Sequence, residues 1–77
     1  CHPASYLARV KSATPEEGWA QLDADTFLSP GSLEAALRAV GGICAAVDAV
    51  VAGEAKTAFV AGRPPGHHAE RDIAMGF

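Results

Sequence analysis

Cysteine, aromatic residues and long apolar runs are all scarce in this sequence. Only two cysteines occur, and they show neither the CxxC nor the zinc-ribbon spacing. This argues against a disulfide-stapled secreted scaffold and against a structural zinc module. We therefore expect a reducing compartment, the cytoplasm, with Cys44 as a small core residue. The most apolar run, residues 40–52, contains Asp48 and two glycines and is shorter than the roughly 18 residues of a membrane span. We expect no association with a membrane.

Positive charge is also in deficit. Six Lys and Arg residues are scattered among nine Asp and Glu residues, which gives a net charge of -3 and no basic patch. We therefore expect no direct binding of nucleic acid. Apolar residues make up 49% of the 77 residues, as in globular proteins, but so short a domain buries only about 60% of its unfolded surface. The chain begins at Cys1 without Met and stops at Phe77, and we expect both ends to be interior points of a longer polypeptide.

The spacing of apolar residues predicts two helices. Residues 3–11 show helical spacing behind a proline that suits the first turn. Residues 33–52 carry one apolar stripe, and we expect Ser32 to cap this helix and Gly53 to end it. The stripe consists of Leu33, Leu37, Val40, Cys44, Val47 and Val51.

Residues 56–61 form a short apolar run rich in strand-forming residues. A run of this kind that follows a helix is typical of one strand of a parallel sheet buried on both faces. Such a strand has no partner among these 77 residues, so its backbone groups would need strands from elsewhere. Residues 14–18 are predicted to form an exposed loop, and residues 19–27 show no clear period.

Two adjacent histidines, His67 and His68, follow a Pro-Pro-Gly turn directly after the predicted strand. Loops at the carboxyl ends of parallel strands commonly carry function, and histidine suits proton transfer near neutral pH. General acid/base catalysis is one interpretation. The alternatives are metal ligation, which is disfavoured because adjacent side chains diverge and zinc needs three or four protein ligands, and an ordinary solvated loop.

The loop Arg63-Pro64-Pro65-Gly66-His67-His68-Ala69, followed by Met75-Gly76-Phe77, closely resembles the tandem-histidine loop of the histone deacetylase family. The Arg-Pro-Pro form is similar to the class II branch and its bacterial relatives, including acetylpolyamine amidohydrolases. Upstream, Leu22-Asp23-Ala24-Asp25-Thr26, then Ser32 with Ala35-Ala36 and Gly41, resembles the same family, as does His2 with Tyr6-Leu7.

The resemblance implies an α/β protein, a fragment of the three-layer α/β/α arginase–deacetylase fold with a parallel sheet. Residues 1–77 would be part of one catalytic domain without an internal boundary, with about one strand and two helices. It implies a zinc-dependent hydrolase that removes acetyl groups from acetylated lysine or polyamine. In that family a zinc-bound water attacks the acetyl carbonyl. By resemblance, His68 would act as general base and then acid, and His67 would stabilise the oxyanion.

The resemblance also assigns substrate-binding residues. Gly76 and Phe77 match positions that line a narrow substrate tunnel, and Asp25 matches an acidic rim residue that holds the substrate's backbone amides. From the residues alone, Phe77 could equally be a core aromatic and Asp25 a turn or capping residue. We assign Asp23 a structural role and expect Arg63 to orient the loop through hydrogen bonds.

Two features separate this sequence from the full family pattern. Gly62 stands where relatives carry a larger apolar residue. The family's zinc ligands, an Asp-x-His pair and a further Asp, are expected after Phe77, so no metal ligand is assigned within the chain and the fragment alone is expected to be inactive. Two other functions stay open: a non-catalytic deacetylase-like binding or scaffold module, and a stand-alone helical mini-domain with an exposed His-His loop.

Overall fold

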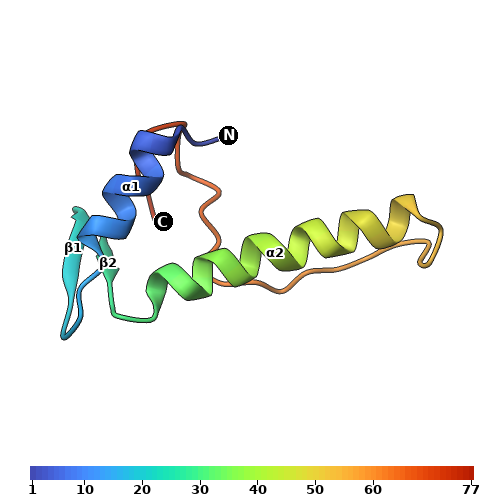
Figure 1. Ribbon diagram of the computed structural model, residues 1–77, viewed down its shortest axis with the longest axis horizontal. Coiled ribbons are helices and arrows are strands. Elements are labelled where there is room, and N and C mark those ends of the chain that lie inside the picture. Colours follow the sequence, from blue (N-terminus) through green and yellow to red (C-terminus); the bar gives the residue numbers. More distant parts are fainter.

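The computed structural model describes residues 1–77. Helix α1 (Ala4–Ala13) is followed by strands β1 (Ala20–Asp23) and β2 (Thr26–Leu28), and then by the long helix α2 (Ser32–Val51). The molecule is elongated, with extents of 41 × 23 × 19 Å. Helix α1 and the two strands form one end, and α2 projects away from them (Figure 1). The chain after α2 returns alongside this helix and finishes near α1.

Helix α1 confirms the first predicted helix. It begins directly after Pro3, whose φ of -69° and extended ψ of 156° suit the position before a helix. Its side chains Tyr6 and Val10, four residues apart on one face of the helix, are buried, and α1 is in contact with β1. Together with Leu28 of β2, which is fully buried, they form the small apolar core.

Strands β1 and β2 form an antiparallel hairpin that the sequence did not predict. The pairing brings Ala20 opposite Leu28, and an irregularity between Gln21 and Asp23 interrupts the register. This bulge breaks the alternation by which strands are recognised. Only β2 shows it, with Thr26 and Leu28 buried on either side of an exposed Phe27.

Helix α2 confirms the second predicted helix and its end at Gly53. The Gly53 amide donates to the Val50 carbonyl and the Glu54 amide to the Ala49 carbonyl. Gly53 has a φ of 78°, so this is the two-bond C-terminal motif in which glycine is favoured. The predicted cap at the other end is wrong. Ser32 is the first helical residue, and its hydroxyl accepts a 2.8 Å hydrogen bond from the Ser29 amide.

The apolar stripe of α2 is uncovered within residues 1–77. No residue of α2 is buried, and the side chains of Leu37, Val40 and Val47 are each more than half exposed. Cys44 is an exposed free thiol, so the expectation that it is a core residue is wrong for this chain. The stripe is a large apolar surface, which in proteins marks a face that packs against something else.

Residues 56–61 form no strand, and the prediction of a parallel strand there is wrong for this structure. They run as an irregular segment alongside α2 (Figure 1). The reason is pairing: a strand needs a neighbour for its backbone groups, and the chain offers none next to this segment. The architecture is thus two helices and one two-stranded antiparallel sheet, without the predicted parallel sheet.

The segment instead packs on α2 through small residues. A Cβ added to Gly62 would lie 3.2 Å from the Ala39 Cβ, which is closer than ordinary contact, and 3.5 Å from the Ala39 Cα, which is within ordinary contact. Gly62 therefore permits a backbone approach that a larger residue would prevent. This accounts for the small residue at a position where a larger one was expected.

Candidate active site

The two histidines occupy the centre of a tight turn. The Ala69 amide donates a 3.1 Å hydrogen bond to the Gly66 carbonyl, so His67 and His68 are the two central residues of a β-turn. Gly66, with a φ of 65°, makes the entry into this turn. Both histidine side chains are exposed, and their rings meet edge to face with centroids 4.3 Å apart.

The turn belongs to a loop that closes on itself. A Cβ placed on Gly66 would lie 3.6 Å from the backbone carbonyl carbon of Phe77, so the beginning and end of residues 66–77 are in contact. A loop of this length with adjacent ends has the form of an Ω-loop, a type that often carries function. We call residues 66–77 the histidine loop.

Helix α1 and the residues before it hold the middle of the histidine loop. His2 Nδ1 lies 2.7 Å from the Arg71 carbonyl oxygen; because a carbonyl only accepts, Nδ1 is the protonated ring nitrogen in this contact. The Arg9 guanidinium donates to the Asp72 carbonyl. Tyr6 joins the two, since the His2 ring stacks on it at 4.5 Å and the Arg9 guanidinium lies 5.1 Å from its ring centroid.

The hairpin holds the end of the histidine loop. The Gly76 amide donates a 3.0 Å hydrogen bond to Thr26 Oγ1, and the Thr26 hydroxyl donates a 2.8 Å bond to Asp23 Oδ2. Asp23 Oδ1 accepts from the Asp25 amide at 2.8 Å. The Asp25 amide first, and the Thr26 hydroxyl second, hold the pKa of Asp23 below its ordinary value. The structural role expected for Asp23 matches these contacts.

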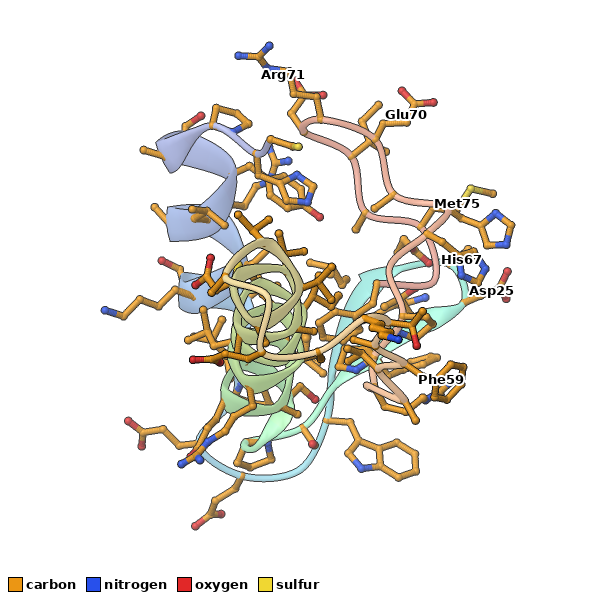
Figure 2. All side chains as sticks on the ribbon, turned by 90° about the vertical axis from the view of Figure 1, so that its right-hand side faces the viewer. Asp25, Phe59, His67, Glu70, Arg71 and Met75 are labelled. Carbon is orange, nitrogen blue, oxygen red and sulfur yellow. The ribbon has the colours of Figure 1, made fainter.

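Asp25 lies in the exposed turn of the hairpin. Figure 2 shows Asp25 and His67 projecting on the same side of the molecule, while Glu70 and Arg71 lie at the far tip of the histidine loop. The bond between Thr26 and Gly76 brings the hairpin turn next to the end of that loop. The structure therefore brings the predicted substrate-binding residues Asp25, Gly76 and Phe77 to one region, with the histidine turn beside Phe77.

An open hollow of about 410 Å³ borders this region. It is lined by Ser29, Gly31, Ser32, Ala35, Arg63, Pro64 and Phe77. Phe77, half-buried, is the only predicted site residue that lines the hollow; the two histidines do not line it.

The Arg63 side chain makes no hydrogen bond in this structure, so its predicted role in orienting the loop by hydrogen bonding is not seen here.

The chain brings no three His, Cys, Asp or Glu side chains together in a group that could hold a metal ion. The histidine pair stands alone, and Cys1 and Cys44 are both exposed and free. The residues present therefore do not make a zinc site among themselves. Neither helix is long and apolar enough to cross a membrane.

Sequence reasoning missed the residues that hold the histidine loop in place. These are His2 and Arg9 on one side and Thr26 on the other. Thr26 had a local signal, because a hydroxyl three residues after an Asp is typical of a side-chain-stabilised turn. His2 and Arg9 had none, since their acceptors are backbone carbonyls more than sixty residues away.

Comparison with known proteins agrees with the resemblance. The family model of the histone deacetylase domain matches residues 1–77. A histone deacetylase-like amidohydrolase of Pseudomonas aeruginosa is 50% identical over 76 residues, which cover 99% of this chain and 20% of that protein. A probable deacetylase of Archaeoglobus fulgidus is 45% identical over 76 residues, covering 99% and 21%. Type-2 histone deacetylase 1 of Dictyostelium discoideum is 58% identical over 50 residues, covering 65% and 3%. The chain thus spans about a fifth of the length of the first two relatives, and far less of the third.

Proposed function

The chain belongs to the histone deacetylase family, and on that premise we propose that it is part of an amidohydrolase that removes acetyl groups from acetylated lysine or an acetylated polyamine. The relatives bear the names of deacetylases and amidohydrolases, which supports hydrolysis of an amide bond. The observation that carries the proposal is the histidine pair, exposed at the centre of a turn whose loop is held at both its middle and its end.

The two histidines have different roles in this proposal. His68 takes a proton from the attacking water and returns it to the leaving amine, because an imidazole can serve as both general base and general acid. His67 donates a hydrogen bond to the oxygen that becomes negative when the carbonyl is attacked. Both side chains are exposed, so nothing within this chain blocks a substrate from reaching them.

Asp25, Gly76 and Phe77 would hold the substrate. The Phe77 ring would form an apolar wall for the aliphatic chain that carries the acetyl group, and Gly76 would let the backbone approach that chain closely. The exposed Asp25 carboxylate is free to accept hydrogen bonds from substrate amides, because only its backbone amide is engaged in the turn.

The complete enzyme is proposed to be zinc-dependent, with its zinc ligands outside residues 1–77. A bound zinc ion would act as a Lewis acid that activates water, as in other zinc hydrolases. Residues 1–77 would contribute the proton-handling and substrate-contacting part of the site. They would form one continuous part of a single catalytic domain with a three-layer α/β/α fold, and the remainder of that domain would cover the exposed stripe of α2. Two free thiols fit our further proposal of a cytoplasmic location.

The proposal is tested on the complete protein that carries this segment. Acetate release would be measured from an acetyl-lysine peptide and from an acetylated polyamine, before and after treatment with a metal chelator. We expect hydrolysis of one of the two, and loss of activity on chelation with recovery on adding zinc.

Variants separate the chemistry from the fold. His68→Ala and His67→Ala should each reduce turnover on the order of 10²-fold or more, with zinc content by metal analysis unchanged. Normal turnover by His68→Ala would remove its assigned role. A protein that binds the acetylated ligand but contains no zinc and releases no acetate would instead be a non-catalytic binding module.

A further inference from the structure

Thr26 is the one polar residue that the structure buries, with 4% of its surface exposed. Its hydroxyl lies between two groups from distant parts of the sequence, the Asp23 carboxylate of the hairpin and the Gly76 amide of the histidine loop. A buried polar side chain is stable only when hydrogen-bonded, and both of these bonds are formed.

The direction of the two bonds is set by chemistry. The Gly76 amide can only donate, and the ionised Asp23 carboxylate can only accept, so the group between them must accept from one and donate to the other at the same time. A hydroxyl does both, whereas the isosteric side chain of valine does neither. The relay runs from the Gly76 N–H to Thr26 Oγ1 and from the Thr26 O–H to Asp23 Oδ2.

The hairpin end of this relay is well fixed. Asp23 is held by the Asp25 amide through its other carboxylate oxygen, and Thr26 lies two residues before the fully buried Leu28 on the same strand. The hydroxyl therefore points from a position that the core determines.

At the loop end of the relay, the Gly76 amide donates to Thr26 Oγ1 and also lies close enough to the Asp23 carboxylate to help lower the pKa of Asp23. Neither Gly76 nor Phe77 takes part in any of the backbone hydrogen bonds outside the helices and strands. Gly76 has a φ of 66°, which glycine adopts readily, whereas the φ of 115° at Phe77 is one that residues with a side chain adopt rarely. Thr26, with the Asp23 carboxylate behind it, holds the Gly76 amide, and Phe77, which lines the hollow, follows directly.

We propose that Thr26 is a positioning residue for substrate binding, which holds Gly76 so that Phe77 is presented to the aliphatic chain of the acetylated amine. The inference rests on the proposed function. The hydrogen bonds of the Thr26 hydroxyl go to Asp23 and Gly76, and none goes to His67 or His68. Its loss therefore weakens substrate binding rather than proton transfer.

The test compares Thr26→Val, which keeps the shape and removes the hydroxyl, with Thr26→Ser, which keeps the hydroxyl. In the complete protein we expect Thr26→Val to raise KM roughly tenfold, with kcat within about threefold of the wild type, and Thr26→Ser to match the wild type. Equal KM values in all three proteins, an equal loss in both variants, or a loss confined to kcat would each overturn the inference. Thr26→Ala replaces Thr26→Val in the same comparison if the latter fails to fold.

A second measurement is independent of activity. Hydrogen exchange, followed in the peptide that carries residues 70–77, should be faster in Thr26→Val than in Thr26→Ser or the wild type, because the Gly76 amide loses the Thr26 hydroxyl oxygen as an acceptor and keeps only the neighbouring Asp23 carboxylate. Unchanged exchange would overturn the hydrogen-bond relay. Absence of acetate release by the wild type would contradict the proposed function, and the exchange experiment would still decide whether Thr26 holds Gly76.

Discussion

Gly62 offers a test of how the histidine loop is placed on the fold. It lies where the chain, returning along α2, reaches the Arg63-Pro64-Pro65 segment that leads into the loop. Replacing it by alanine adds one methyl group. That methyl would meet the Ala39 Cβ at 3.2 Å and the Ala39 Cα at 3.5 Å, and neither atom belongs to a flexible side chain that could turn away.

The magnitude follows from these distances. Apolar carbon atoms pack at about 3.5–4.0 Å, so the segment must move off α2 by several tenths of an ångström. Overpacking in a core costs about 1–3 kcal/mol of stability, and since Gly62 is exposed we expect a loss near the lower end of that range. Gly62 directly precedes Arg63-Pro64-Pro65, so a shift there should also displace the histidine turn, and the complete protein with Gly62→Ala should lose part of the proposed acetate release.

The assay is the free energy of unfolding of the complete protein from urea titration, with acetate release measured in parallel. Gly31→Ala is the control for a methyl group added without a clash, because its added Cβ meets nothing within 4 Å and its φ is -89°; since Gly31 is the N-cap of α2, we expect only the cost of alanine at that position, about 0.5 kcal/mol. The double variant Ala39→Gly with Gly62→Ala removes the clash, and its loss should be smaller than the sum of the two single losses. Additive losses, or a Gly62→Ala protein as stable as Gly31→Ala, would refute the close-approach reasoning.

Two further predictions concern the hairpin. Leu28→Ala removes most of a fully buried side chain and should lower the free energy of unfolding, measured by urea titration, by about 2–5 kcal/mol. The control Leu7→Ala, at a site 54% exposed, should lower it far less. Equal losses in the two variants would contradict the assigned core. Asp23→Asn tests the lowered pKa. Since the folded pKa lies below the ordinary 3.8, the carboxylate stabilises the fold above that value and loses this effect as pH falls through the folded pKa. Asp23→Asn should thus be less stable than wild type near neutral pH and approach it in acid, whereas a gap independent of pH would count against this.

Local patterns in the sequence were sufficient for the two helices and for the family. The helical spacing around Tyr6 and along α2 has a period that a helix satisfies. Gly53 ends α2 because its own φ of 78° is a conformation that favours glycine. The tandem-histidine motif is a continuous stretch of chain, so no folding information was needed to recognise it. The assigned roles of His67, His68, Asp25, Gly76 and Phe77 are still predictions.

Predictions that rested on patterns of only a few residues were less successful. The hairpin was missed because β1 and β2 are four and three residues long and interrupted by a bulge. The predicted Ser32 cap was wrong by one position, because α2 is capped at Gly31 and Ser32 is its first helical residue. The Ser32 hydroxyl accepts a hydrogen bond from the Ser29 amide instead of capping the helix. The prediction of a strand at residues 56–61 was wrong for this structure. An apolar run indicates that a segment could enter a sheet, but a strand forms only where a neighbouring strand is present to share its backbone hydrogen bonds.

The side chains available for chemistry can be read along the chain: two adjacent histidines follow a Pro-Pro-Gly turn, and a Gly-Phe pair comes shortly after them. The contacts that hold them in place are long-range and depend on the folded path of the chain. Thr26 reaches Gly76 across fifty residues, and Arg9 and His2 reach backbone carbonyls more than sixty residues away. Such contacts leave no periodic signal, because a backbone carbonyl or amide is the same at every position, and only the folded path of the chain determines which one a side chain meets.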